Sequence, residues 1–214
     1  HTRYPLVTGV QTCALPIFVF MGMGEPLHNS DEVEKAVYLL SDPQWFGLSL
    51  RTITVSTAGV PQKMIALARR FPKLRLALSL HSADAEKRRK LVPRAVGDLA
   101  VLKRTIQEIN AIQNDTLWIE IALIDGVNDT REDARKLIAF CDGLNVEVNV
   151  IPYNDTSHAA PSEFRQPKAE QVTFFVSELR KAGIFTTHRK TLGDSIQAAC
   201  GQLAVPAELR KDTI

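Results

Sequence analysis

The residue with the clearest chemical potential is Cys200, which stands in the segment HRKTLGDSIQAACGQLA (188–204) beside two alanines and a glycine. A cysteine reacts as its thiolate, and small neighbours leave a loop slim enough to bring the sulfur against a ligand. The alternative is a small buried hydrophobic residue, the role of most free cysteines. The other two cysteines, Cys13 and Cys141, are distant in sequence and form no CxxC pair with it. We therefore expect no disulfide framework and no metal site from these residues.

Polar residues that could bind a ligand follow five short apolar runs of the chain. They are Gly24 and Glu25, Ser56 and Thr57, Ser79 and His81, Asp125 and Asn128, and Asn154. Taken singly, each has a structural interpretation: an exposed carboxylate, a helix N-cap, a histidine with satisfied hydrogen bonds, or a turn residue. Polar groups after all five runs also fit a binding site that is assembled from several loops.

The five apolar runs alternate with stretches of helical periodicity. We predict strands at 18–22, 51–57, 74–80, 117–124 and 146–153, and helices at 31–40, 60–71, 98–112, 131–141 and 167–182. This alternation is typical of an α/β fold with one parallel sheet. Such folds place their sites at the carboxyl ends of the strands, so we expect the polar residues on one edge. The runs are apolar nearly throughout, which indicates helices on both faces of the sheet.

Composition limits the class of protein. The 214 residues are 45% hydrophobic and 23% charged, with a net charge of +2, which suits a single domain with one sizeable core. No apolar run approaches the ~20 residues that span a bilayer, and the cysteine usage fits a reducing cytoplasm. We expect a cytoplasmic monomer. Basic residues gather at 69–75 and 86–94. These clusters permit a nucleic-acid partner, although solvated helix faces are the favoured explanation for either cluster taken alone.

Residues 1–17 require separate treatment. The segment HTRYPLVTGVQTCALPI shows neither strand nor helix periodicity and does not read as a signal peptide. Back-translation of Val7–Ile17 matches a common sequencing-library adapter in frame. We expect a non-native tail over 1–17, a chemically irrelevant Cys13, and a natural protein that begins upstream of Phe18. The alternative is an unusual but genuine N-terminal tail.

The chain contains, in this order, the segments GMGEPLHN, ITVSTAG, ALSLHS, IEIALIDGVND, VNVIPYN and RKTLGDSIQAACGQLA. They resemble the motifs of RlmN-type radical S-adenosylmethionine (SAM) enzymes, which methylate carbon 2 of adenine in 23S rRNA and tRNA. The resemblance extends from Phe18 to about Ala204, and the closing AACGQLA is its most specific part. It implies a partial (β/α) barrel of the radical SAM type over 18–214. The first barrel strand is missing, so that the runs are strands two to six and a catalytic-cysteine loop follows.

The resemblance also implies roles for individual residues. The implied SAM-binding residues are Gly24, Glu25, Ser56, Ser79, Leu80, His81 and Asn154. Among them, Glu25 binds the amino group of SAM, and Asn154 closes over the ligand. Cys200 is the implied methyl carrier, which becomes S-methylcysteine before the methyl group passes to RNA.

One feature of the resembled family is absent from this sequence. Radical SAM enzymes hold a [4Fe–4S] cluster through a CxxxCxxC motif, and this chain has none. The cluster ligands, a second catalytic cysteine, a general-base glutamate and an RNA-contacting domain are all expected upstream, so we expect this chain alone to be inactive. Two other functions stay open: methylation of carbon 8 of the same adenine, and a non-catalytic RNA-binding barrel.

Overall fold

The computed structural model describes residues 17–22, 24–93, 97–154 and 164–188. Within these ranges six strands form one parallel sheet in sequence order. The strands are β1 (Phe18–Phe20), β2 (Ile53–Thr57), β3 (Arg75–Ser79), β4 (Leu117–Leu123), β5 (Val146–Pro152) and β6 (Phe185–His188). The five predicted strands are therefore confirmed, and β6 is an addition to them. The proposed tail 1–17 lies outside the described residues apart from Ile17.

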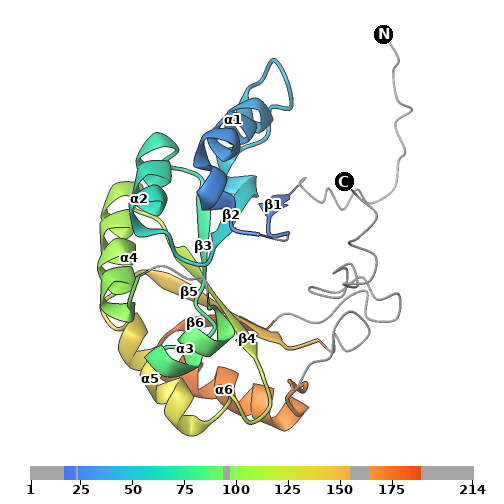
Figure 1. Ribbon diagram of the computed structural model, residues 1–214, viewed down its shortest axis with the longest axis vertical. Coiled ribbons are helices and arrows are strands. Elements are labelled where there is room, and N and C mark those ends of the chain that lie inside the picture. Colours follow the sequence, from blue (N-terminus) through green and yellow to red (C-terminus); the bar gives the residue numbers. More distant parts are fainter. Residues whose placement is uncertain (1–16, 23, 94–96, 155–163, 189–214) are drawn as a thin grey trace, which may run out of the picture.

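Helices connect the strands and lie along the outer side of the curved sheet (Figure 1). They are α1 (Ser30–Ser41), α2 (Pro61–Arg70), α3 (Ala85–Leu91), α4 (Leu99–Gln113), α5 (Arg131–Cys141) and α6 (Ala169–Lys181), with short 3-10 helices η1 (Pro26–Asn29) and η2 (Leu50–Thr52). All five predicted helices are present, and α3 is an addition. No described helix has the length and apolar character needed to cross a bilayer. The arrangement confirms the predicted partial α/β barrel.

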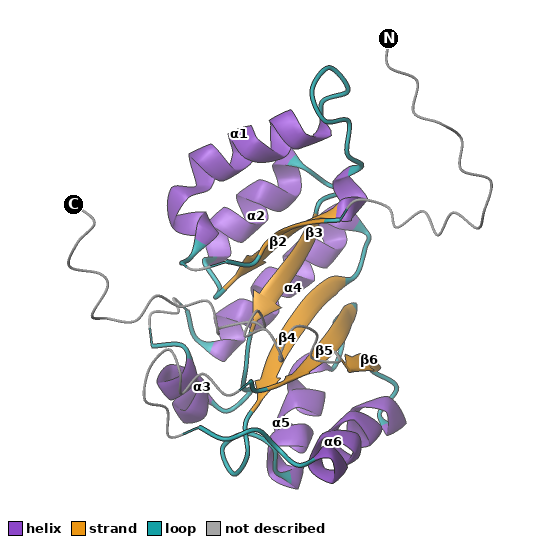
Figure 2. Cartoon of the chain, turned by 90° about the vertical axis from the view of Figure 1, so that its right-hand side faces the viewer, coloured by secondary structure: helices purple, strands orange, loops and turns teal. Residues whose placement is uncertain are grey.

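The two faces of the sheet differ, contrary to the expectation of helices on both faces. Alternate residues of the strands, such as Val55, Leu78, Ile119 and Val148, are fully buried in one core with the helices. The residues between them point to the other face, because successive side chains of a strand alternate. In Figure 2 the strands face the viewer, and α4 lies behind them. The sheet thus has a helix-covered outer face and an inner face of different chemistry.

Helix α3 is joined to α5 by two ion pairs that use the capping carboxylates of both helices. Asp84 caps α3, accepting from two backbone amides at 3.0 Å, and its other oxygen lies 2.7 Å from Lys136 Nζ of α5. In return, Asp133 belongs to the capping box of α5 and receives Lys87 Nζ of α3 at 2.7 Å. Each lysine thus neutralises the carboxylate that starts the other helix, which fixes α3 beside the carboxyl ends of the strands.

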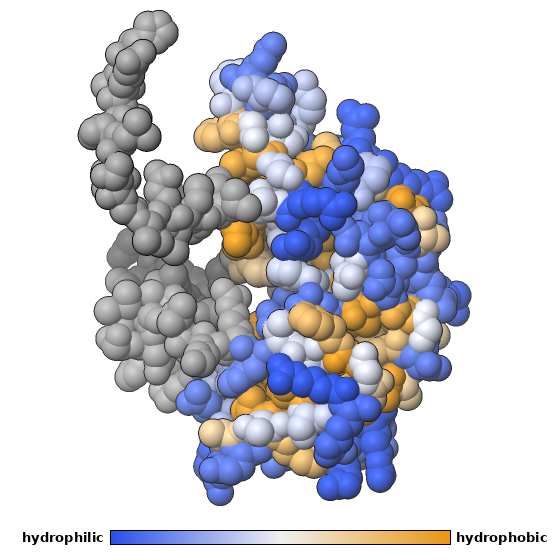
Figure 3. All heavy atoms as spheres, turned by 180° about the vertical axis from the view of Figure 1, so that it is seen from behind, coloured by the Kyte–Doolittle hydropathy of each residue, from blue (hydrophilic) through white to orange (hydrophobic). Residues whose placement is uncertain are grey.

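The free edge of β1 is apolar. Ile17 is 70% exposed, Phe18 39% and Val19 47%, and hydrophobic surface is visible on the side of the molecule where β1 lies (Figure 3). A strand whose outer edge is unpaired and whose apolar side chains are exposed can pair with another chain.

The paired caps predict a pH-dependent stability. Asp84→Asn keeps a good N-cap but loses the charge facing Lys136, so we expect the free energy of unfolding at pH 7 to fall by about 0.5–1 kcal/mol. Asp84→Ala also loses the cap, which costs about 1 kcal/mol more. Hydrogen bonds from Lys136 and the helix amides lower the pKa of Asp84 to about 2.

Because the folded pKa of this carboxyl lies below its unfolded value of 3.8, the stabilisation is present above pH 3.8 and is lost as the pH falls towards 2. Urea unfolding should therefore show the difference between Asp84→Asn and the parent narrowing over this range. Equal stability of the two proteins at pH 7 would show that the ion pair contributes nothing.

Candidate functional site

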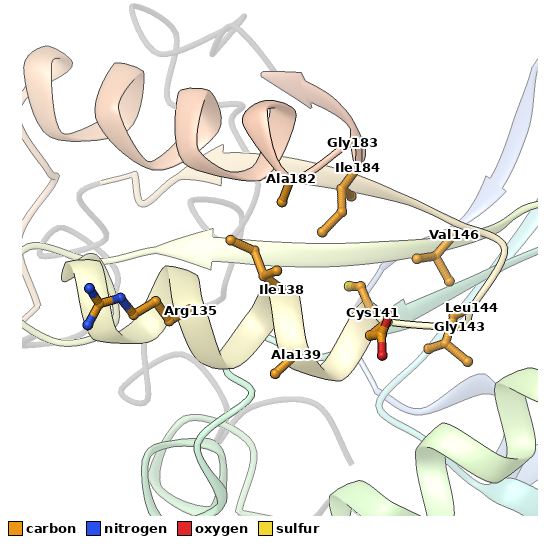
Figure 4. Close-up of a pocket in the computed structure, with 11 residues that line it drawn as sticks. Arg135, Ile138, Ala139, Cys141, Gly143, Leu144, Val146, Ala182, Gly183 and Ile184 are labelled. Atoms are coloured by element: carbon orange, nitrogen blue, oxygen red, sulfur yellow. The ribbon is translucent and has the colours of Figure 1, made fainter.

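A cavity of about 540 Å³ lies at the amino ends of the strands. Its walls come from the end of α5, the segment that leads into β5, and the turn between α6 and β6 (Figure 4). Cys141 is the nucleophilic group in this wall, and burial raises the pKa of its thiol to about 12. A thiol that stays protonated at neutral pH is not a nucleophile. Its burial indicates that Cys141 has a structural role.

The opposite edge, where the carboxyl ends of the strands meet, carries the sequence-predicted residues, and we call it the carboxyl edge. Glu25 lies in the loop after β1, and its two carboxylate oxygens accept from the backbone amides of Leu27 at 2.9 Å and Ala58 at 2.6 Å. Ala58 directly follows β2, so this side chain joins two neighbouring loops. A carboxylate has about four lone-pair sites, so Glu25 can also accept from a ligand cation. Gly24, with a φ of 92°, supplies the left-handed turn before it.

A row of polar side chains crosses the inner face of the sheet. Ser56 Oγ of β2 lies 3.2 Å from Ser79 Oγ of β3, and Ser79 is in register with Glu120 of β4. Asn149 of β5 donates to Glu120 at 2.9 Å and accepts from Thr187 of β6 at 3.1 Å. Five adjacent strands thus contribute one polar residue each. This polar row gives the inner face donors and acceptors at the level of the carboxyl edge.

His81 follows β3 and is held in one tautomer. Its Nδ1 accepts from the backbone amide of Ala122 at 3.1 Å, so the ring proton resides on Nε2. Burial, and then the positive charge of Arg88, lower the pKa of this imidazole to about 4. His81 is therefore neutral at pH 7 and can donate one hydrogen bond from Nε2. Its backbone is left-handed, with a φ of 57°, a conformation that is uncommon outside glycine.

Arg88 of α3 was not anticipated from the sequence, where it stands in a basic cluster. The residue is only 4% exposed, and it donates to backbone carbonyls of two loops: those of Ser79 at 2.9 Å, Leu80 at 2.5 Å and Ala58 at 2.6 Å. Burial lowers the pKa of Arg88 to about 10, so it stays charged at neutral pH. A cation thus lies directly beneath the carboxyl edge. This burial has no signal in the sequence, because Lys87, Arg89 and Lys90 beside it are equally basic.

Asn128 stabilises the turn after β4, which agrees with its interpretation as a turn residue. Its amide accepts from Ile124 at 2.8 Å and donates to the carbonyls of His81 at 2.6 Å and Ala122 at 2.8 Å, which ties the ends of β3 and β4 together. Leu80 is fully buried, and Asn154 is buried after β5. Cys200 lies outside the described residues, so the structure does not test its predicted role.

Some residues of the two basic clusters contact other parts of the fold. Arg69 pairs with Glu108 at 2.8 Å, and Lys87 pairs with Asp133. Arg88 is buried beneath the carboxyl edge. These contacts give Arg69, Lys87 and Arg88 roles within the fold.

The chemistry of the carboxyl edge fits the amino-acid and ribose parts of SAM. Glu25 offers anionic oxygens for an ammonium group, while Ser56, Ser79 and His81 offer neutral donors and acceptors. The fit to an iron–sulfur cluster is different. Across the described ranges no three Cys, His, Asp or Glu side chains gather as metal ligands, and Cys141 is the free cysteine there. Cluster ligands are not among these residues.

Comparison with known sequences gives a consistent result. The model of the radical SAM superfamily matches residues 16–141. A probable RNA methyltransferase of Rhodopirellula baltica is 47% identical over 186 residues, which are 86% of this chain and 48% of that protein. A probable dual-specificity RNA methyltransferase RlmN of Treponema pallidum is 43% identical over 190 residues, covering 88% and 55%. The chain therefore spans about half the length of the curated relatives that it matches.

Comparison with solved structures supports the same assignment. A radical SAM methyltransferase from Sphaerobacter thermophilus superposes with a TM-score of 0.82 at 35% identity, over 87% of this chain and 54% of that one. A domain of pyruvate-formate lyase-activating enzyme from Bacteroides vulgatus superposes with a TM-score of 0.60 at 20% identity, over 80% and 98%, and shows the likeness of fold alone. The family match over 16–141, the parallel sheet and the carboxyl edge lead to one conclusion: the chain belongs to the radical SAM superfamily.

Proposed function

We propose that this chain provides the SAM-binding barrel and the methyl-carrying cysteine of an enzyme that methylates carbon 2 of adenine in 23S rRNA and tRNA. The observation that carries the proposal is the arrangement of the carboxyl edge. Glu25, Ser56, Ser79 and His81 lie at the carboxyl ends of three neighbouring parallel strands, in a sequence that is 43% identical to an RlmN-named protein over 190 residues. Relatives named as RNA methyltransferases support an RNA substrate, and the choice of 23S rRNA and tRNA is the finer part of the proposal.

Each residue of the carboxyl edge has a definite task in this proposal. Glu25 binds the ammonium group of SAM with the lone pairs that its two backbone contacts leave free. Ser56 and Ser79 present hydroxyl groups side by side to the polar part of the ligand. His81 donates from Nε2 while remaining uncharged, so that it does not repel the sulfonium. The backbone at Gly24, the buried Leu80 and Asn154 complete the walls.

Cys200 is the proposed acceptor of the methyl group. Carbon 2 of adenine is electron-poor and has no nucleophilic electron pair, so an electrophilic methyl group cannot be transferred to it directly. A thiolate can take that group first: a sulfur–carbon bond forms on Cys200 and the sulfonium–methyl bond of SAM breaks, releasing S-adenosylhomocysteine (SAH). The radical chemistry of the second stage is supplied by SAM bound at an iron–sulfur cluster, whose ligands are not among the described residues. The same carrier logic serves methylation of carbon 8, which is the alternative product.

The carboxylate of Glu25 predicts a charge-dependent affinity for SAH, which keeps the amino and carboxylate groups of SAM. We expect Glu25→Gln to weaken SAH binding by about tenfold or more, because a hydrogen bond to a charged group contributes about 1.5–3 kcal/mol. Binding is measured by NMR titration of the 214-residue chain. Glu32→Gln, which changes an exposed carboxylate of α1, is the matched control and should bind like the parent. Equal affinity of the parent and Glu25→Gln would remove Glu25 from the site.

The proposed carrier role predicts a covalent mark. In a protein with the full length of its relatives, purified from cells that supply SAM, mass spectrometry should find the peptide containing Cys200 heavier by one methyl group. Cys200→Ala should transfer no methyl group to RNA. Cys141→Ala should behave like the parent apart from a packing loss of roughly 1 kcal/mol. Methyl transfer by Cys200→Ala would rule out the carrier role, and a methyl group on carbon 8 of adenine would favour the alternative product.

A further inference from the structure

Arg88 is the point at which two loops of the carboxyl edge are joined. Its Nη1 donates to the carbonyls of Ser79 and Leu80 at the end of β3, at 2.9 and 2.5 Å. Its Nη2 donates to the carbonyl of Ala58 after β2, at 2.6 Å. The two nitrogens of one planar group thus hold two loops at a fixed separation. The ammonium group of a lysine is a single point and cannot reproduce this bridge.

The need to fill space in the core does not explain why a charged side chain is buried at position 88. Within the ranges that the structure describes, no carboxylate lies within ion-pair distance of its guanidinium, and its buried Nε has no hydrogen-bond partner there. Burial of a cation without a carboxylate is costly, and a neutral side chain could fill the same space at a lower cost. The three contacts with backbone carbonyls are therefore the feature that distinguishes Arg88 from a neutral side chain at this position.

The backbone of Ala58 is held at both its N–H and its C=O. Glu25 accepts from its N–H at 2.6 Å, and Arg88 donates to its C=O at 2.6 Å. The next residue, Gly59, has a φ of 105°, and an added Cβ would lie 2.8 Å from Leu102 Cδ2, so this turn fits closely against α4. A continuous chain of contacts therefore runs from the loop after β1, through Ala58, to the loop that carries His81.

We infer that Arg88 is a positioning residue that sets the relative placement of Glu25, Ser79 and His81 for ligand binding. The inference rests on the proposed SAM site, and it adds the residue that assembles that site. Arg88 acts through backbone carbonyls and not by touching the ligand. The geometry of the bridge, and not the positive charge alone, is the property that matters. Arg88→Lys therefore separates the two, because it keeps the charge and loses the second point of attachment.

The test compares Arg88→Met, Arg88→Lys and the control Arg89→Met in the 214-residue chain. Arg89 is the exposed neighbour on the same helix. SAH affinity is measured by NMR titration, folding by urea unfolding, and local opening by amide hydrogen exchange at Ala58 and Leu80. We expect at least tenfold weaker SAH binding in both Arg88 variants, faster exchange at Ala58 and Leu80, unchanged exchange in α5, and affinity within twofold of the parent in Arg89→Met.

Three results would overturn the inference. These are parent-like affinity in Arg88→Lys, parent-like affinity in Arg88→Met, and a loss of affinity accompanied by equally faster exchange in α5, which would mark a general loss of structure. If the parent binds no SAH, the proposed ligand is wrong. Hydrogen exchange alone then tests whether Arg88 holds the two loops in place. Faster exchange confined to Ala58 and Leu80 would then support the bridge, and unchanged or uniform exchange would reject it.

Discussion

The backbone of Ala58 is the point on which the geometry of the candidate site depends. Its N–H is fixed by the carboxylate of Glu25 and its C=O by the guanidinium of Arg88, so that one residue links the loops after three parallel strands. Both contacts involve a charged group, and such hydrogen bonds are about twice as strong as neutral ones. The parallel order of the strands brings these loops to one edge, and the two charges determine how they face each other.

Much of the fold could be predicted from local sequence patterns. The five β-branched runs and the five amphipathic stretches recur in the structure with small shifts at their ends. The strand β6 (Phe185–His188) was missed because four residues after a helix-ending glycine show too little periodicity, and its formation depends on the neighbouring β5. Helix α3 was missed because its seven residues are mostly charged and lack an apolar stripe. Its position depends on ion pairs with α5, which no local pattern reveals.

In the candidate site, too, some residues could be predicted from the sequence and others could not. Glu25, Ser56, Ser79 and His81 could be placed at strand ends because a parallel sheet makes the ends of its strands neighbours. The burial of Arg88 could not be predicted, because its partners are backbone carbonyls, which every residue has. The polar inner face was also hidden, since Glu120 and Asn149 each stand alone between apolar neighbours and join only through the register of β4 and β5.

The account makes the carboxyl edge the place where SAM binds, while a cavity of about 540 Å³ lies at the opposite edge. The most direct measurement is a map of amide chemical-shift changes during titration of the 214-residue chain with SAH. The account predicts that the largest changes occur at Ala58, Leu80 and His81. Changes centred instead on Ala139, Leu144 and Gly183, which line the cavity at the amino ends of the strands, would contradict it.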